Sequence, residues 1–197
     1  MRRCALLDRD GTIVVEKHYL KSIDQLELLP DAVEGLRMLA AGGFGLIVIS
    51  NQSGVGRGLV TVEEVEAIHA ELRRRLAAQG VEIAAIYYCP HSPAEHCGCR
   101  KPLTELAEQA SKEFGFNLAE AVVIGDKTSD IEFGRAIGAR TILVRTGYGR
   151  EHEPNARPDA VVNTLREAAR LLSGSGPSTD TSAPAEHPRT NAVQTSG

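Results

Sequence analysis

The sequence lacks any run of about 18 apolar residues, the length that a helix needs to cross a bilayer, so we expect no membrane span. An apolar signal core near the N-terminus is also missing, and the cytoplasm is therefore the expected location. Positive charge is not in excess, because 22 Lys and Arg residues stand against 26 Asp and Glu residues. This balance argues against a general nucleic-acid-binding protein. No feature indicates self-association, and a monomer is the default expectation.

Short apolar runs alternate with amphipathic stretches along the 197 residues. This order predicts an α/β fold of the Rossmann-like type, an open parallel sheet with helices on both faces. The expected strands are Cys4–Leu7, Gly45–Ile49, Ala84–Tyr88, Ala121–Ile124 and Thr141–Val144. The expected helices are Asp31–Ala41, Thr61–Gln79, Leu103–Phe114, Thr128–Ile137 and Val162–Leu172. A hydrophobic content of 42% is sufficient for one core.

The composition changes at Ser173. From there to the C-terminus Ser, Thr, Pro, Gly and Ala dominate, and large apolar residues almost vanish. Such a segment cannot offset the entropy lost on ordering. We therefore expect one folded domain over residues 1–172 and a disordered polar tail over residues 173–197.

Cysteine is scarce, yet three of the four cysteines crowd into one loop. Cys89 and His91 form a Cys-x-His pair, and Cys97 and Cys99 form a Cys-x-Cys pair. Three thiolates and one imidazole make the closed tetrahedral shell that is typical of structural Zn²⁺. His96 is a rival ligand, but a solvated loop histidine is the preferred interpretation. The alternative, that the thiols bind nothing, is disfavoured by two tightly spaced pairs within eleven residues.

Acidic side chains follow two of the expected strands, at the edge of the sheet where ligands bind in open α/β folds. Asp8 and Asp10 follow the first strand, and Asp126 follows the fourth. Asp8 and Asp10 lie on the same side of an extended segment and would repel each other without a cation between them. We therefore expect Mg²⁺, a hard ion that prefers oxygen ligands, to be held by Asp8, Asp10 and Asp126.

These residues suit phosphoryl transfer. Once a cation neutralises the charges, Asp8 can attack phosphorus and form an aspartyl-phosphate. Asp10 would protonate the leaving alkoxide and later deprotonate the attacking water. Ser50 and Lys101 are the candidates for stabilising the transferred phosphoryl group. No long insertion follows the first or second strand beyond one helix, so we expect no large cap domain and a small phosphorylated metabolite as substrate.

The motifs resemble those of the haloacid dehalogenase superfamily. They are Asp8-x-Asp10-Gly11-Thr12, a Ser at the end of the second strand, a downstream Lys, and Gly125-Asp126-x-x-x-Asp130, spread over most of residues 4–149. The resemblance implies that Asp8 is the nucleophile and Asp10 the acid/base. It further implies that Ser50 and Lys101 stabilise the phosphoryl group, that Asp126 binds Mg²⁺, and that Asp130 supports the site.

Within that superfamily the zinc loop running into Arg100-Lys101-Pro102 resembles the heptose bisphosphate 7-phosphatase family, whose close relative is the histidinol-phosphate phosphatase family. This resemblance implies a phosphorylated sugar substrate from nucleotide-activated heptose biosynthesis. The substrate contacts expected from it are Glu16, Lys17, His18, Tyr19, Asn51, Gln52, Ser53, Arg57, Arg100 and Lys127.

Two alternatives remain open. A histidinol-phosphate phosphatase is favoured by the short loop between His91 and Cys97, and Glu16 is the only obvious partner for its substrate's ammonium group. Arg57, Arg100 and Lys127 instead favour a bisphosphate. The other alternative is a non-catalytic binding module stabilised by zinc, which would have no need of Asp10.

Overall fold

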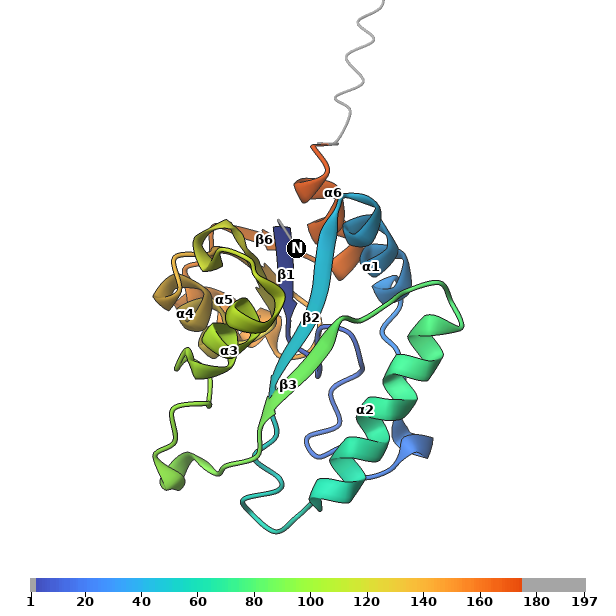
Figure 1. The fold of residues 1–197 in the computed structure, drawn as a ribbon, viewed down its shortest axis with the longest axis vertical. Coiled ribbons are helices and arrows are strands. Elements are labelled where there is room, and N and C mark those ends of the chain that lie inside the picture. Colours follow the sequence, from blue (N-terminus) through green and yellow to red (C-terminus); the bar gives the residue numbers. More distant parts are fainter. Residues whose placement is uncertain (1–2, 175–197) are drawn as a thin grey trace, which may run out of the picture.

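The computed structural model describes residues 3–174, which form a six-stranded parallel sheet in the order β3-β2-β1-β4-β5-β6 (Figure 1). The strands are β1 (Arg3–Leu7), β2 (Phe44–Asn51), β3 (Ala85–Cys89), β4 (Val122–Gly125), β5 (Arg140–Val144) and β6 (Ala160–Val162). The predicted open parallel sheet is confirmed. All but the first two positions of the expected tail lie outside the described residues.

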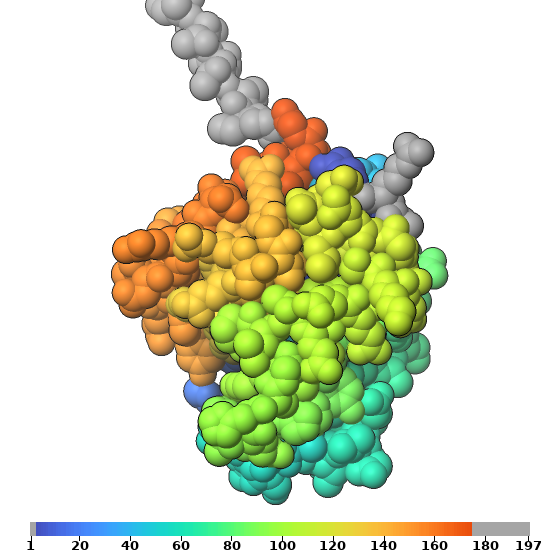
Figure 2. Space-filling view, turned by 60° about the vertical axis from the view of Figure 1, so that its left-hand side comes forward, coloured from blue at the N-terminus to red at the C-terminus, as the bar shows by residue number. Residues whose placement is uncertain are grey.

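Helices cover both faces of the sheet. One face carries α1 (Ala32–Ala41), α2 (Val62–Ala77) and α6 (Leu165–Leu172), and the other carries α3 (Glu105–Phe114), α4 (Thr128–Ala136) and α5 (Gly149–Ala156). Single 3-10 turns lie at Ile23–Gln25, Pro93–Glu95 and Leu118–Glu120. The space-filling view shows the second face, where yellow-green α3 and the orange segments beside it hide the sheet (Figure 2). Within the described residues no helix has the length and hydrophobicity for a bilayer crossing.

The sequence of the central strand β1 is apolar without alternation because both faces of the strand are covered. Side chains of a strand point to opposite faces in turn. In β1, Ala5 and Leu7 pack in the core shared with α1, α2 and α6, whereas Cys4 and Leu6 pack on the side of α3 and α4. Each of these four residues is buried, as expected for a parallel strand that is covered on both faces.

Two elements were not predicted, and one boundary was wrong. The sixth strand covers only three half-buried residues, too short for a period to be visible. Its last residue, Val162, was assigned to the final helix, which in fact begins at Leu165 after the cap Thr164. Helix α5 contains Pro154 and few apolar residues, so it gave no helical pattern. The remaining strands and helices lie within three residues of their predicted bounds.

The sequence of α2 specifies both where the helix begins and which of its faces is buried. It begins with a capping box in which Glu64 N donates to Thr61 Oγ1 at 3.1 Å and Thr61 N donates to Glu64 Oε2 at 2.7 Å. Val65, Ile68, Leu72 and Leu76 form the buried stripe toward the sheet. One histidine, His69, is buried beside that stripe and is 5% exposed.

Close packing of α1 on the start of α6 depends on Gly35. A Cβ at this position would lie 2.8 Å from backbone atoms of Leu165 and Arg166. Alanine normally stabilises a helix by about 1 kcal/mol relative to glycine. Here the two helices would have to separate, and we expect Gly35→Ala to lower the free energy of unfolding by about 1–3 kcal/mol in chemical denaturation.

Ala40→Gly is the matched control, because Ala40 is an exposed residue of the same helix. It should lower the free energy of unfolding by at most about 1 kcal/mol, from helix propensity alone. Stabilisation by Gly35→Ala would contradict the close approach of α1 and α6.

Candidate active site

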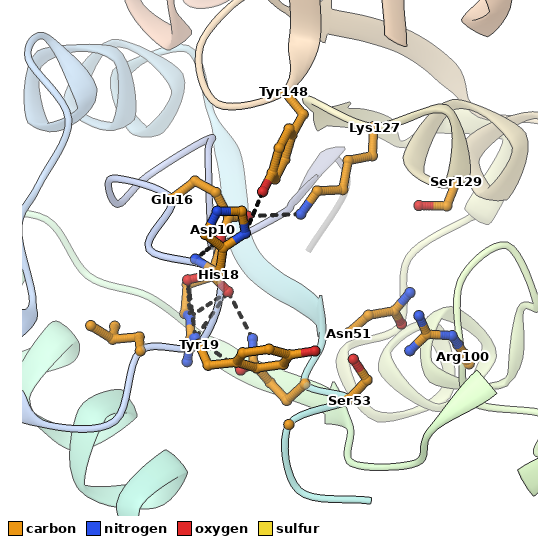
Figure 3. A pocket seen from close by; sticks show the side chains of 14 residues that line it. Asp10, Glu16, His18, Tyr19, Asn51, Ser53, Arg100, Lys127, Ser129 and Tyr148 are labelled. Carbon is orange, nitrogen blue, oxygen red and sulfur yellow. Dashed lines mark hydrogen bonds and ion pairs between the residues drawn. The ribbon is translucent and has the colours of Figure 1, made fainter. Parts of the chain in front are cut away.

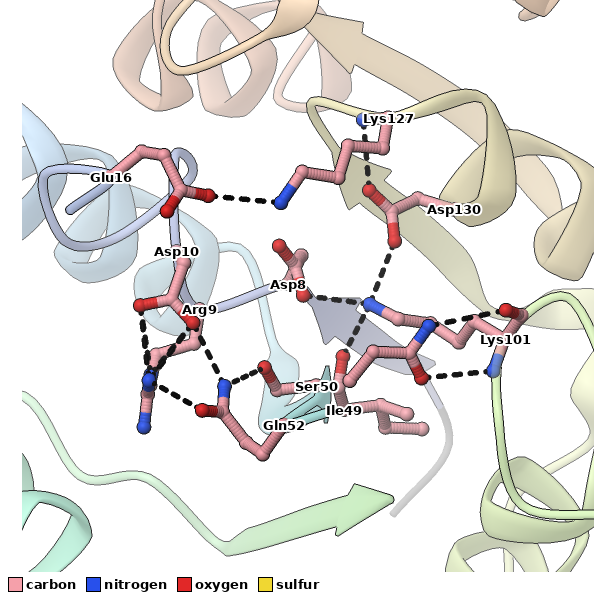
Figure 4. A network of polar contacts seen from close by, with 11 residues as sticks. Asp8, Arg9, Asp10, Glu16, Ile49, Ser50, Gln52, Lys101, Lys127 and Asp130 are labelled. Carbon is pink, nitrogen blue, oxygen red and sulfur yellow. Dashed lines mark hydrogen bonds and ion pairs between the residues drawn. The ribbon is translucent and has the colours of Figure 1, made fainter. Parts of the chain in front are cut away.

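The amine of Lys101 lies at the centre of a polar network at the carboxyl end of the sheet (Figure 4). Its Nζ donates to Asp8 Oδ1 at 2.7 Å, to Asp130 Oδ1 at 2.7 Å and to the carbonyl of Ile49 at 2.6 Å. These acceptors engage all three N–H groups of the ammonium. Burial opposes the charge, but Asp130 and Asp8 together outweigh burial and raise the pKa of Lys101. Lys101 is therefore a fixed positive charge.

The backbone of Lys101 is held by the end of β2. Lys101 N donates to Asn51 Oδ1 at 3.0 Å, and Asn51 Nδ2 donates back to the Lys101 carbonyl at 3.1 Å. Asn51 is itself paired in register with Cys89 of β3. The sheet thus positions a lysine that is fifty residues away in sequence.

Three buried carboxylates gather beside this amine. Asp8 follows β1, Asp126 follows β4, and Asp130 lies in the first turn of α4, and one oxygen from each lies within 4.8 Å of the others. Burial, together with mutual repulsion that Lys101 only partly offsets, raises the pKa of Asp8 to about 6. Burial and the charges of Asp8 and Asp130 raise the pKa of Asp126 to about 8. A cation would relieve this repulsion.

The carboxylate oxygens differ in their partners. Both oxygens of Asp130 are engaged, one by Lys101 Nζ and the other by Lys127 N at 2.9 Å. Asp126 Oδ2 accepts from Tyr148 N at 2.8 Å, whereas Asp126 Oδ1 is buried without a hydrogen-bond partner among the described residues. A buried carboxylate oxygen without a donor is unfavourable unless a cation binds it. Asp8 and Asp126 are thus the residues that would hold a divalent cation.

The Asp10 side chain lies outside this group of three carboxylates, and its place among the Mg²⁺ ligands stays a prediction. Arg9 Nε and Nη2 each contact both Asp10 oxygens at 2.9–3.1 Å, and Gln52 Nε2 donates to Asp10 Oδ2 at 2.8 Å. Burial opposes the charge of Asp10, but Arg9 and then Gln52 outweigh it and lower the pKa of Asp10. The third carboxylate of the group is Asp130.

The predicted catalytic residues line one inner pocket of about 30 Å³. Asp8, Asp10, Ser50 and Lys101 all contribute to its wall. Ser50 is 1% exposed, and its Oγ accepts from Gln52 Nε2 at 2.8 Å. Because the hydroxyl hydrogen of a serine that accepts in this way stays available, Ser50 can still donate to a ligand in the pocket.

A larger cleft of about 270 Å³ (Figure 3) adjoins the inner pocket, because Asp10, Asn51, Lys127 and Ser129 line both. Its wall includes eight of the ten predicted substrate contacts: Glu16, His18, Tyr19, Asn51, Gln52, Ser53, Arg100 and Lys127. Lys17 and Arg57 do not line it. Lys17 pairs with Glu27 at 2.9 Å, and Arg57 is exposed on the loop before α2.

Side-chain contacts tie the loop after β1 to the loops after β4 and β5 across this cleft. Lys127 Nζ pairs with Glu16 Oε2 at 2.9 Å, and the Tyr148 hydroxyl bonds His18 Nδ1 at 2.6 Å. Tyr148 and Arg9 were missed in the sequence. The position of Arg9 between two functional aspartates was the available signal, whereas Tyr148 had none beyond following the last predicted strand.

Two glycines make room for Asp126. Gly11 has φ of 83° and Gly147 has φ of 53°, conformations that favour glycine. A Cβ on either residue would clash with the Asp126 carboxylate. The turns after β1 and after β5 therefore need glycine at positions 11 and 147 to pack against this carboxylate.

The Cys/His loop forms a second cluster of possible metal ligands. Cys89 Sγ lies 3.5 Å from Cys97 Sγ and 3.6 Å from His91 Nδ1, and His91 Nδ1 lies 3.2 Å from Cys99 Sγ. A tetrahedral zinc shell with Zn–S near 2.3 Å and Zn–N near 2.0 Å places its ligand atoms about 3.5–3.8 Å apart, so the first two distances fit and the third would lengthen slightly around an ion. The four predicted residues thus fit Zn²⁺, and the exposed His96 is not among them.

Known proteins resemble this chain over most of its length. The HAD-hydrolase-like family model matches residues 98–168. The D-glycero-beta-D-manno-heptose-1,7-bisphosphate 7-phosphatase of Pseudomonas aeruginosa is 38% identical over 149 residues, which are 75% of this chain and 84% of that protein. The protein of the same name from Yersinia pestis is 35% identical over 174 residues, which are 84% of this chain and 93% of that protein.

Solved structures similar to this chain include phosphatases of the same kind. The D,D-heptose 1,7-bisphosphate phosphatase from B. bronchiseptica, complexed with magnesium and phosphate, has a TM-score of 0.81 and 31% identity, and the match covers 87% of this chain and 98% of that chain. The corresponding phosphatase from Burkholderia thailandensis has a TM-score of 0.69 and 29% identity, covering 88% and 99%.

Because Asp126 has an oxygen without a partner among the described residues and Asp130 has no such oxygen, we expect Asp126 to contribute more than Asp130 to the affinity for Mg²⁺. Changes to groups that only support metal ligands weaken binding about 10–100-fold. We therefore expect Asp126→Asn to weaken Mg²⁺ binding at least about tenfold in isothermal titration calorimetry. Asp130→Asn makes the same charge change on a side chain whose oxygens are already engaged, and its loss should be smaller. An equal or larger loss from Asp130→Asn would overturn the assignment.

Proposed function

Because this chain belongs to the heptose bisphosphate phosphatase family of the HAD-like hydrolases, we propose that it removes the 7-phosphate of D-glycero-D-manno-heptose 1,7-bisphosphate. As a member of that family it is a phosphoric monoester hydrolase. The proposed reaction serves the synthesis of nucleotide-activated heptose in the cytoplasm. The observation that supports it most directly is the Lys101 amine, bonded to Asp8 and Asp130 at 2.7 Å each, beside the unpartnered oxygen of Asp126.

The inner pocket suits the first half of the reaction. A divalent cation bound by Asp8 and Asp126 would neutralise the charges that keep a phosphate from a carboxylate. An oxygen of Asp8 then forms a bond to phosphorus while the bond from phosphorus to the sugar oxygen breaks. Lys101 and Ser50 face the phosphoryl oxygens in this pocket, where their charge and hydroxyl stabilise the transferred group.

Asp10 is placed to move protons because it lines both the inner pocket and the cleft. It gives a proton to the leaving sugar oxygen in the first step. In the second step it takes a proton from the water whose oxygen attacks phosphorus, and the bond between phosphorus and Asp8 breaks to release phosphate. A bound phosphate anion opposes the ionised form of Asp10, so substrate binding favours the protonated acid.

The cleft favours a bisphosphate over histidinol phosphate. Arg100 and Lys127 lie in its wall and can bind a second phosphate. Glu16, the carboxylate expected to meet an ammonium group, is already paired with Lys127 at 2.9 Å. An amino-alcohol phosphate would have to break this ion pair. A binding module without catalysis would not require the buried arrangement of Asp8, Asp10 and Lys101.

The Cys/His cluster would hold Zn²⁺ in a structural role. Its four ligands close a tetrahedral shell and leave no position for a substrate. Cys99 lies two residues before Lys101, so a zinc ion would fix the loop from which Arg100 and Lys101 extend. Reduced thiols of this kind fit a reducing compartment such as the cytoplasm.

The substrate proposal predicts a clear preference. We expect kcat/KM for D-glycero-D-manno-heptose 1,7-bisphosphate to exceed that for histidinol phosphate at least about 100-fold, because Arg100 and Lys127 can bind the second phosphate that histidinol phosphate lacks. Phosphate release measured with both substrates in the presence of Mg²⁺ provides the test. Asp8→Asn, which keeps the shape of the nucleophile, should remove turnover of both. Equal or reversed preference in the unaltered protein would refute the proposed substrate.

The zinc proposal predicts one tightly bound Zn²⁺ per chain, measured by elemental analysis of the purified protein. Cys97→Ser should lose the metal and lower the melting temperature, because a structural zinc contributes folding free energy. Cys4→Ser is the matched control: Cys4 is buried in β1 away from the cluster, so its zinc content should be unchanged. Full zinc content in Cys97→Ser would contradict the ligand set.

A further inference from the structure

The guanidinium of Arg9 is buried and is shared among three side chains. Arg9 is 1% exposed. Its Nε and Nη2 hold the Asp10 carboxylate, and Nη2 also donates to Gln52 Oε1 at 2.9 Å. The remaining nitrogen, Nη1, lies 2.9 Å from His69 Nε2. Every edge of the guanidinium therefore faces a polar partner, and each partner limits its rotation.

The chemistry of the two groups settles the direction of the contact with His69. A guanidinium has only N–H donors, so Nε2 of His69 must accept with its lone pair and the imidazole must be neutral. Burial, and next the charge of Arg9, lower the pKa of His69 to about 3. His69 thus presents a permanent acceptor to Arg9 from the buried side of α2.

We propose that His69 is a positioning residue for the proton-transfer step: through Arg9 Nη1 it holds the guanidinium in the orientation that aims the Asp10 carboxylate into the site. The inference rests on the proposed role of Asp10 as acid and base. His69 belongs to α2, sixty residues from Arg9, and it lines neither the cleft nor the inner pocket.

If His69 served only to fill space, its ring shape would matter and its hydrogen-bond acceptor would not. Its ring meets Tyr88 edge-on, with centroids 5.1 Å apart. A phenylalanine would preserve an aromatic ring against Tyr88, in a slightly larger side chain, but would remove the acceptor. Arg9 Nη1 would then be a buried donor without a partner, which is unfavourable enough to turn the guanidinium toward other acceptors. The Asp10 carboxylate, held by the same rigid fork, would lose its fixed position.

The test uses two substrates that differ in their need for an acid. The oxygen that leaves a sugar phosphate must be protonated, whereas p-nitrophenyl phosphate releases a stable anion without a proton. The quantity to compare is kcat/KM, which reports on the first phosphoryl transfer. It is determined for His69→Phe and for a second acceptor-free variant, His69→Leu. His69→Gln retains an acceptor that can reach Arg9, and Asp10→Asn marks complete loss of the acid.

We expect both acceptor-free variants to lose at least about tenfold in kcat/KM on the heptose bisphosphate and less than about threefold on p-nitrophenyl phosphate. His69→Gln should restore most of the lost rate. Equal losses on both substrates, or no recovery in His69→Gln, would overturn the positioning role. If Asp10→Asn itself affects both substrates equally, the fault lies in the proposed role of Asp10, so the two failures are distinguishable.

Discussion

A buried ammonium group, that of Lys101, connects the parts of the site. A charge this deeply buried, with its side chain 3% exposed, is tolerated only when every N–H group is satisfied and opposite charges lie beside it. Asp8 after β1, Asp130 on α4 and the carbonyl of Ile49 in β2 meet these needs together. The same contacts bring Asp8, Asp130 and Lys101 together in the wall of one pocket.

The aspartates of the site fall into two sets with different neighbours. Asp8 and Asp126 lie close together in a buried group. Burial and mutual repulsion raise the pKa values of both, and a bound cation would relieve this repulsion. Asp10 lies two residues from Asp8, yet Arg9 and Gln52 surround it with donors and lower its pKa. In the proposed reaction, carboxylates of one chemical type would therefore serve as metal ligand and as proton carrier because their neighbours differ.

The order of the motifs allowed the parallel sheet and the gathering of polar residues at its carboxyl edge to be predicted from sequence. Residues directly after buried strands, such as Asp8 and Asp126, are fixed to one edge of the sheet by the parallel topology. The direction of the Asp10 side chain could not be predicted, because it depends on Arg9, which depends in turn on His69 from another helix. The connection from β5 to β6 was missed for a different reason: α5 and β6 carry too few apolar residues to show a period.

We propose that the phosphoryl group passes from the substrate to Asp8 in the pocket around Lys101. Rapid acid quenching of the protein mixed with labelled heptose bisphosphate and Mg²⁺, followed by peptide mass spectrometry, tests it directly. We expect one phosphoryl group on the peptide that contains Asp8, formed before the first turnover is complete. A phosphoryl group on any other side chain, or turnover with no phosphorylated protein at any quench time, would contradict it.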